Sequence, residues 1–334
     1  MKRYIISILV CLVLIALFFN PQPVVASPYY QGKTITIIVG YGPGGGYDRI
    51  ARILAKHLSK YIPGNPSVLV QNMPGADSMI AANYLYNIAK PDGLTIGAFA
   101  RGLVFAQLLK GQGVKFDLTK FAWIGSAAVE STVLVLHTDL PYKTIEDVAK
   151  AKSAIVLGST GPADSGWQFA LFLKLLGYNF KDVVYPSGND IKLAIERKEV
   201  DGRGMTYSSA KIYIATGLVI PIVRGRAVEP GIENLPMDED LAKGAREKTL
   251  MAMRSAPDSV GRPYVAPPGT PAALMNVLRE AFAKVAKDPG ALEDARKNML
   301  GLEYVPAQEV QKVLQHFLNQ PPDIVKEFGK YVKF

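Results

Sequence analysis

The sequence predicts an α/β protein of two lobes, each built on a mainly parallel sheet flanked by helices, with a ligand cleft between them. Three observations support this prediction. Short apolar segments alternate with segments of helical periodicity, which is typical of β-α-β units. About 308 residues follow an N-terminal signal, a length that usually forms two domains. The last part of the chain is nearly all helical and needs a sheet to pack against.

Residues 1–26 are predicted to be a secretory signal peptide. Lys2 and Arg3 precede an apolar run at 5–19, and small residues follow up to Ala26, which is the order found in such signals. A membrane anchor is the alternative, but the fifteen apolar residues are short of the roughly 20 that a spanning helix needs. We therefore expect a protein that is exported to the periplasm and is not embedded in the membrane after cleavage.

Cysteine content and charge exclude several classes of function. Cys11 is the only cysteine and lies in the predicted signal, so no disulfide or thiol chemistry is expected in the mature chain. Lipidation of Cys11 is disfavoured because Val10 is larger than the residue that normally precedes such a site. The formal charge of +9 falls to +7 without Lys2 and Arg3. Because basic residues are scattered among acids, nucleic-acid binding is not predicted, whereas small anions are favoured.

The first part of the mature chain is predicted to contain strand-helix repeats. Ile50, Ile53, Leu54 and Leu58 recur at helical spacing, and turn-forming residues separate the elements. The expected strands are 34–39, 67–70 and 94–99, and the expected helices are 49–58 and 80–89.

A second series of elements follows residue 125. Thr144 and Asp147 are placed as a capping box at a helix start, and Phe169 and Leu173 share one helical face. The expected strands are 132–136, 155–158, 183–185, one that ends at 205, and 219–223, and further helices are expected at 165–176 and 191–197. Residues 228–254, rich in charge and proline, are expected to be a connection back to the first lobe.

The C-terminal tail is predicted to be helical and to return to the first sheet. Pro271 stands at a position favoured at helix starts, and helices are expected at 272–286, 290–298, 307–318 and 322–332. The predicted organisation is therefore a signal peptide at 1–26, a first lobe from 27–129 and 256–334, and a second lobe from 130–255.

The loop IVGYGPGGGYD at 38–48 is the main candidate for ligand binding. Gly40, Gly42 and Gly45 fit G-x-G-x-x-G, but the second strand ends in QN at 71–72 and lacks the acid that binds a ribose. No Gly-Lys-Ser/Thr of a phosphate loop follows. Glycines beside a helix start expose backbone N–H groups that bind anions. We predict a carboxylate here and no cofactor; a tight turn that binds nothing is the alternative.

Several segments, taken in order, resemble the receptors of tripartite tricarboxylate transporters, also called Bug receptors. Together they span nearly the whole mature chain. The segments are GPGGGYD at 42–48, QNMPGA at 71–76, PDGLTIG at 91–97, FDL at 116–118, GSTG at 158–161, Y and SG at 185–188, VD at 200–201, and APPGTP at 266–271.

The resemblance implies a type II-like periplasmic-binding-protein fold that closes around a small carboxylate and delivers it to integral-membrane transporter subunits. We expect a monomer. In the family, the first strand-helix loop holds one carboxylate. Carried over to this chain, the ligand-binding residues are Tyr41, Gly42, Pro43, Gly44, Gly45, Gly46, Tyr47 and Asp48, then Gly97, Ala98, Phe99 and Arg101, and from the opposing lobe Ser159, Thr160, Gly161, Asp164, Tyr207 and Ser208.

Two of these residues have alternative interpretations. Arg101 follows a predicted strand end, where a guanidinium suits a carboxylate, but a solvated arginine fits the sequence equally well. Asp164 would bind a cationic group if it faces the cleft, although a helix cap is the stronger interpretation. Arg203, Arg254 and Arg262 are weaker candidates. Departures from the family around Tyr41 and at 162–168 leave the identity of the acid open.

No enzyme activity is predicted. A secreted hydrolase needs an activated nucleophile, and the chain has neither Gly-x-Ser-x-Gly nor His-Glu-x-x-His. His57, His137 and His316 are far apart, and no pair has zinc-ligand spacing. Binding without chemistry remains, either for transport or as a ligand-presenting sensor for a membrane receptor.

Overall fold

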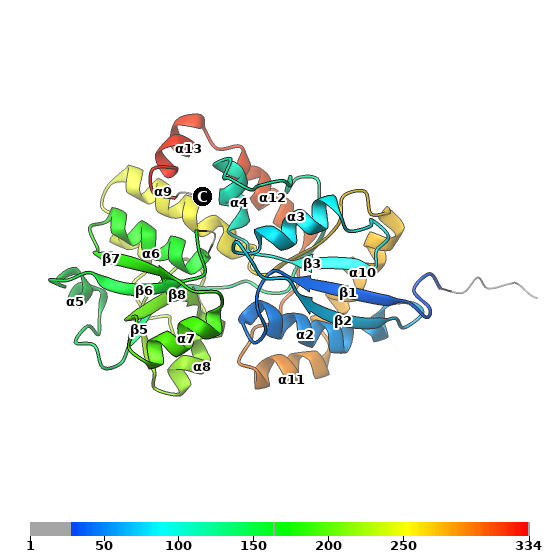
Figure 1. Cartoon of the computed structure of the whole chain (residues 1–334), viewed down its shortest axis with the longest axis horizontal. Coiled ribbons are helices and arrows are strands. Elements are labelled where there is room, and N and C mark those ends of the chain that lie inside the picture. Colours follow the sequence, from blue (N-terminus) through cyan, green and yellow to red (C-terminus); the bar gives the residue numbers. More distant parts are fainter. Residues whose placement is uncertain (1–27, 163, 333–334) are drawn as a thin grey trace, which may run out of the picture.

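Two mixed sheets, each covered by helices, form the two lobes of the molecule (Figure 1). The computed structural model describes residues 28–162 and 164–332. The predicted signal peptide and Cys11 lie outside the described residues. In the part of the chain that the structure describes, no helix has the length and apolar character needed to cross a membrane.

The first sheet has the order β11-β4-β10-β3-β1-β2. Its parallel part pairs β1 with both β2 and β3, while β10 runs antiparallel between β3 and β4, and β11 is antiparallel to β4. The strands are β1 (Thr34–Val39), β2 (Ser67–Asn72), β3 (Thr95–Ala98), β4 (Ala122–Ser126), β10 (Pro263–Ala266) and β11 (Val305–Pro306). The helices around it are α2 (Gly46–Leu58), α3 (Met79–Asn87), α4 (Leu103–Leu108), α10 (Ala272–Val285), α11 (Pro289–Lys297), α12 (Ala307–Leu318) and α13 (Pro322–Phe328).

The second sheet has the order β7-β6-β8-β5-β9. Strand β6 pairs in parallel with β7 and β8, and β5 is antiparallel to β8 and β9. The strands are β5 (Thr132–His137), β6 (Ile155–Ser159), β7 (Phe180–Val184), β8 (Gly202–Thr206) and β9 (Val219–Arg224). The helices are α5 (Ile145–Ala149), α6 (Ser165–Leu175), α7 (Gly188–Glu196), α8 (Tyr207–Ala215) and α9 (Ala245–Ser255), and short 3-10 turns lie at Ser59–Tyr61, Asp238–Leu241 and Ala256–Ser259.

Alternation along the strands divides each lobe into two apolar layers. In β1, Ile37 and Val39 join the cluster that contains α2 and α10, whereas Ile38 joins the cluster on the other face, with α3 and α4. Strand β5 behaves in the same way, with Val133 packing toward α7 and α8 and Leu134 toward α6 and α9. Successive side chains of a strand point to opposite faces, so both sheets are buried on both sides.

Helix α6 lies unusually close to the second sheet. A Cβ atom on Gly166 would come within 2.0 Å of the Gly204 carbonyl oxygen, and one on Gly204 would come equally close to the Gly166 carbonyl oxygen. Both positions therefore require glycine, because any side chain would force the helix off β8. This contact fixes the start of α6, which lies at the candidate site.

The two-lobed α/β fold is confirmed, and the strands expected in the first half of the chain are present with shifts of a few residues at their ends. The capping box of Thr144 and Asp147 is formed. The expected parallel parts are extended by antiparallel strands, so each sheet is mixed. The lobe boundaries at 129/130 and 255/256 stay a prediction.

Some expectations about individual elements were wrong. Residues 228–254 are not only a connection, because they contain most of α9, which buries Leu250 and Met251. The strands β4, β10 and β11 and the helix α4 were not expected. Strand β10 has only four residues and begins with Pro263, so it shows no periodicity to read. The last helix ends at Phe328 and does not extend to 332.

The chain passes between the two sheets after β4 and again before β10, and the C-terminal helix adds a third connection. The Phe328 ring in α13 lies 5.1 Å from Phe105 of α4 and 4.9 Å from Phe172 of α6, measured between ring centroids. An ion pair of Arg246 and Glu327 joins α9 to α13, and Figure 1 shows these helices side by side. One apolar cluster therefore crosses from lobe to lobe behind the site.

Candidate functional site

An inner cavity of about 320 Å³ lies between the two lobes. The loop between β1 and α2 forms one wall, and the ends of β6 and β8 with the starts of α6, α7 and α8 form the other. The lining residues of the first wall and the crossing segments are Tyr41, Gly42, Pro43, Gly44, Gly45, Gly46, Tyr47, Arg49, Arg101 and Arg262, and those of the second are Thr160, Asp164, Ser165, Gly188, Asn189, Lys192, Arg203, Met205, Thr206, Ser209, Ile212 and Tyr213.

A second, outer cavity of about 700 Å³ shares Tyr41 and Thr160 with the inner one. It is wider, and Asp77 is the only acidic or basic side chain among the described residues that line it. The inner cavity collects most of the charged groups and falls at the small end of the roughly 300–1,000 Å³ range of ligand pockets. We therefore treat the inner cavity as the candidate binding site and the outer one as its entrance.

The glycine loop is shaped from behind by Asp48. Its buried carboxylate accepts hydrogen bonds from Gly44 N at 2.8 Å, Arg52 Nε at 2.9 Å and Asn72 Nδ2 at 2.9 Å. Although burial acts in the opposite direction, these hydrogen bonds lower the pKa of Asp48. Asp48 is thus an anion that positions the loop.

Helix α2 begins at the cavity without a side-chain cap. Its N-cap residue is Gly45, which makes no capping hydrogen bond, so the first N–H groups of the helix are left for a ligand or water. A Cβ atom on Gly46 would lie 2.5 Å from Ser209 Oγ and 2.7 Å from Arg262 Nη2. Glycine at 46 therefore lets the second lobe approach the helix start.

Tyr41 and Tyr47 form a stacked pair at this wall, with ring centroids 4.9 Å apart. The Tyr47 hydroxyl accepts a hydrogen bond from Arg101 N at 3.2 Å. Burial raises the pKa of both phenols, so both remain neutral and offer polar contacts without adding charge.

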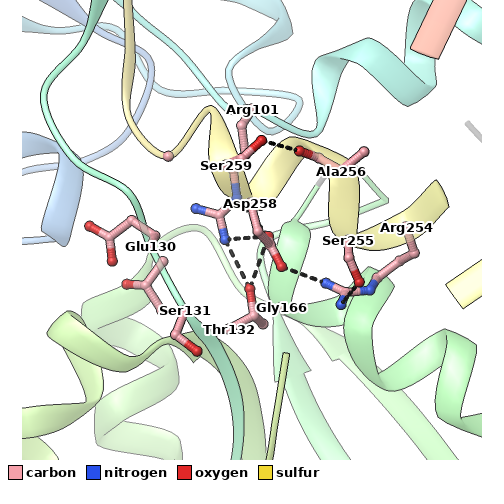
Figure 2. A network of polar contacts seen from close by, with 12 residues as sticks. Arg101, Glu130, Ser131, Thr132, Gly166, Arg254, Ser255, Ala256, Asp258 and Ser259 are labelled. Carbon is pink, nitrogen blue, oxygen red and sulfur yellow. Dashed lines mark hydrogen bonds and ion pairs between the residues drawn. The ribbon is translucent and has the colours of Figure 1, made fainter. Parts of the chain in front are cut away.

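Arg101 is buried in a network that ties the lobes to the crossing segment (Figure 2). Its Nε donates to Asp258 Oδ1 at 3.1 Å, and its Nη2 donates to Thr132 Oγ1 at 3.0 Å. On the other side of Asp258, Arg254 Nη1 donates to Oδ2 at 2.8 Å, and Arg254 Nη2 reaches Asp238 at 2.7 Å. The Nη1 atom of Arg101 is buried and has no partner among the described residues.

Arg262 holds the second crossing point. Its Nε lies 2.7 Å from Glu130 Oε1, its Nη1 donates to the Gly46 carbonyl oxygen at 2.6 Å, and its Nη2 donates to Ser208 Oγ at 2.9 Å. Ser208 in turn donates to Glu130 Oε2 at 2.7 Å. Arg262 therefore joins the start of α2 to the start of α8 at the edge of the cavity.

Asp164 caps helix α6 and also lines the cavity. Its Oδ1 accepts from Gly166 N at 2.8 Å, its Oδ2 accepts from Thr160 N at 3.0 Å, and Arg203 Nη2 lies 3.5 Å from Oδ2. The capping interpretation is confirmed, and the same residue also lines the cavity. Asp164 therefore both caps α6 and contributes to the wall of the cavity.

The charge of the lining is strongly positive. It includes four arginines and one lysine, Arg49, Arg101, Lys192, Arg203 and Arg262, against a single carboxylate among the described residues, Asp164. Asp258, Glu130 and Asp164 balance three of the arginines, and Lys192 pairs with Glu196. Arg49 has no carboxylate partner within the described ranges, and burial together with the neighbouring Arg262 lowers its pKa. An anion inside the cavity would offset this charge.

The potential metal ligands in the described part of the chain do not gather into a cluster. No group of three or more His, Cys, Asp or Glu side chains is placed to hold a metal ion within 28–162 and 164–332. All three histidines are described, and none of them lines the cavity. His57 instead contacts Asp294, at 2.7 Å from its Nε2.

The structure brings ten of the proposed site residues to the inner cavity: Tyr41, Gly42, Pro43, Gly44, Gly45, Gly46, Tyr47, Arg101, Thr160 and Asp164. The arginine at 101 is buried and paired, which excludes a solvated surface side chain. The other eight lie behind or beside it: Asp48, Gly97, Ala98, Phe99, Ser159, Gly161, Tyr207 and Ser208.

The eight proposed residues that do not line the inner cavity have other roles in the structure. A Cβ on Gly97 would fall 1.9 Å from Leu85 Cδ1, so that glycine permits α3 to pack on β3. Ala98 and Phe99 are core residues, Ser159 donates to Asp182, and Gly161 lines the outer cavity. Asp48 and Ser208 support the walls through the hydrogen bonds given above. Tyr207 packs in the cluster around α8.

Sequence reasoning missed part of the lining. Arg49, Lys192 and Asn189 were not proposed, and Arg203 and Arg262 were rated only as weak candidates. Arg49 and Lys192 are charged positions on amphipathic helices, where exposure is the usual expectation. Only the placement of the two lobes in the structure shows that Arg49 and Lys192 line the same cavity.

Comparison with known proteins gives a consistent result. The model of the tripartite tricarboxylate transporter family receptor matches residues 50–330. A UPF0065 protein of Bordetella pertussis is 27% identical over 308 residues, which cover 90% of this chain and 91% of that protein.

Two solved structures share the fold. The periplasmic binding protein BugD superposes with a TM-score of 0.74 at 22% identity, covering 91% of this chain and 99% of BugD. MatC of Rhodopseudomonas palustris, solved with bound malate, gives a TM-score of 0.70 at 19% identity, covering 88% of this chain and 99% of MatC.

Proposed function

Because the chain belongs to the family of tripartite tricarboxylate transporter receptors, we propose that its inner cavity captures a small organic carboxylate for delivery to the membrane subunits of such a transporter. The two lobes hold the acid between them, and the closed form is what the membrane subunits recognise. The acid is held without forming a covalent bond to the protein.

The unpaired Nη1 of Arg101 carries this proposal. A guanidinium nitrogen that is buried without an acceptor is costly, and a carboxylate in the cavity would supply the acceptor that the described residues do not. The uncapped start of α2 lies on the same wall and offers backbone N–H groups with the positive end of the helix dipole. Arg49 adds a further positive charge that no carboxylate of the described residues balances. These features favour an acid over a neutral ligand.

Delivery to a transporter sets the remaining expectations. We propose a monomeric protein of the periplasm that acts without a cofactor and without catalysis. The absence of any histidine from the cavity lining, with all three histidines described, supports binding without catalysis, because the cavity then lacks the side chain that most often acts as a general base near neutral pH. MatC, which shares the fold, holds malate, and this makes a hydroxy- or dicarboxylic acid a reasonable first probe.

A ligand screen tests the proposal. The chain from Ser27, unfolded and refolded to remove any carried-over ligand, is heated with malate, adipate, citrate, aromatic acids, amino acids or nicotinamide nucleotides. An acid present at about 100 times its Kd should add about 2.7 kcal/mol of stability. Stabilisation by one group of acids is expected. A response to nucleotides with none to acids would instead favour a dinucleotide-binding protein.

A matched pair of variants tests the site itself. Arg49→Gln removes a cavity charge, and Lys312→Gln removes a charge of the same sign from an exposed position on α12. Loss of a hydrogen bond to a charged group is worth about 1.5–3 kcal/mol, so Arg49→Gln should weaken binding of the best acid by roughly ten- to a hundredfold in calorimetry. Equal affinities for the two variants would place the acid elsewhere.

A further inference from the structure

Asp77 stands at an unusual position in the loop between β2 and α3. Ala76, Asp77 and Ser78 have φ angles of 44°, 51° and 75°, a left-handed conformation that costs an L-residue about 1–2 kcal/mol. Glycine would adopt it more easily. Strain of this kind is retained where the surrounding structure and a function require the side chain. The Asp77 side chain is 5% exposed and lines the outer cavity.

The carboxyl of Asp77 meets the second lobe at Thr160. Asp77 Oδ1 lies 2.9 Å from Thr160 Oγ1, and the same hydroxyl oxygen lies 3.2 Å from Asp164 Oδ2. A hydroxyl has one proton to donate, and two ionised carboxylates can only accept. Both short contacts are hydrogen bonds only if one of the two carboxyls is itself protonated.

The partners of each carboxyl show where that proton lies. Both carboxyl oxygens of Asp164 accept from backbone N–H groups, which can only donate, and Arg203 lies beside one of them. The buried Oδ2 of Asp77 has no hydrogen-bond partner among the described residues, so this oxygen lacks a donor that would stabilise a negative charge. Asp77 is therefore the protonated member: it donates to Thr160, and Thr160 donates to Asp164.

The charged and titratable groups around Asp77 agree with this assignment. Burial and the charge of Asp164 raise the pKa of Asp77 to about 8, against the lowering effects of Thr160, Tyr41 and Arg203. In an open form, Asp77 would face water, away from the second lobe, with an ordinary aspartate pKa of about 3.9.

We propose that Asp77, Thr160 and Asp164 form a proton-dependent latch, so that closing the two lobes binds one proton at Asp77. The latch goes beyond carboxylate capture, since it makes the open-closed equilibrium respond to pH whatever acid is bound. At a lower pH the latch stabilises the closed form of the receptor, and at a higher pH the lobes open more readily.

The direction follows from the two pKa values. The closed form has the higher pKa, so the stabilisation of closure is complete below the open-form value. As pH rises from there to about 8, the ratio of closed to open molecules falls by at most about tenfold per pH unit. Above about 8 the contribution of the latch is lost.

A distance measurement across the entrance tests the latch without any ligand. The predicted mature chain has no cysteine, so in the double variant Gln112→Cys and Val184→Cys the two introduced thiols are the only sites that a spin label can modify. These two exposed residues line the outer cavity from opposite lobes. Double electron-electron resonance is recorded on refolded protein from about pH 5.5 to about pH 8.5, a range that brackets the raised pKa of Asp77. We expect a short distance between the labels at low pH, which gives way to a longer distance as pH rises.

Two variants separate the latch from general effects of pH. Asp77→Asn keeps a donor toward Thr160 but cannot ionise, so it should keep the short distance over the whole pH range. Asp182→Asn is the control: burial raises the pKa of Asp182 to about 6, yet its partner Ser159 belongs to the same lobe, so this variant should follow the parent protein. A parent distance that does not change with pH, or Asp77→Asn that follows the parent, would refute the latch.

Discussion

At the scale of single residues, Gly46 controls how closely the second lobe can approach the start of α2. A Cβ atom there would overlap Ser209 of the second lobe and the end of the Arg262 side chain, which lies just before β10. The contact with Ser209 would be absent if the lobes were apart. Gly46 thus matters for closure more than for folding.

Gly46→Ala should weaken binding without lowering stability. Alanine favours helix α2 over glycine by up to about 1 kcal/mol, so the ligand-free melting temperature should stay the same or rise. Overpacking in the closed form should cost about 1–3 kcal/mol, which corresponds to a loss of affinity of roughly five- to 150-fold for the best acid of the screen.

Gly301→Ala is the matched control, because a Cβ at this position meets nothing within 4 Å. It should leave the affinity unchanged. Calorimetric titration of both variants decides the point. An unchanged affinity of Gly46→Ala would mean that closure around the acid does not bring Ser209 to this position.

At the scale of elements, the crossing segment around Asp258 is held by buried ion pairs. Asp258 accepts from Arg101 and from Arg254, and all three side chains are almost fully buried. Removing one partner of such a network leaves charge without compensation, which costs far more than the loss of an exposed pair. Stability and the geometry of the site are therefore linked through one carboxylate.

Asp258→Asn should lower the free energy of unfolding by about 3–5 kcal/mol, measured by urea denaturation. Arg101 would lose its carboxylate partner, while Arg254 would keep Asp238. The exposed pair of Glu309 and Lys312 provides the control, and Glu309→Gln should change stability by at most about 1 kcal/mol. Similar effects of the two substitutions would show that the buried network contributes little.

At the scale of the whole molecule, helix α13 ties the two lobes together on a side of the molecule away from the glycine loop. Phe328 contacts α4 in the first lobe and α6 in the second, and its side chain is fully buried. The C-terminal helix therefore belongs to the core of both lobes. A hinge motion must either carry this contact along or pivot about it.

Phe328→Ala should lower the free energy of unfolding by about 3–5 kcal/mol, the usual cost of deleting a buried aromatic ring. Leu292→Ala is the control, since Leu292 is 41% exposed, and it should cost far less. Urea denaturation of both variants tests this. A small effect of Phe328→Ala would mean that α13 is not packed across the lobes in solution.

The sequence by itself determined the two-lobed α/β fold, because alternating periodicities and turn residues act locally and mark strands, helices and loops in order. The family was indicated by the resemblance of several short segments, which also keep their order along the chain. The sequence also indicated the glycine loop, since surplus glycine before a helix is a local feature. Sequence periodicity could not predict β10, because this strand is too short to show an alternating pattern. It also could not predict α9, because the many charged residues of this helix obscured its buried face.

Only the tertiary structure decided which side chains share the cavity. Arg49, Arg101, Asp164, Lys192 and Arg262 come from distant parts of the chain, and their sequence context is that of ordinary surface or capping residues. Whether a charge is solvated or buried depends on what packs over it, which no local pattern encodes. For the same physical reason, the meeting of Asp77 with Thr160 and Asp164 became visible only once both lobes were in place.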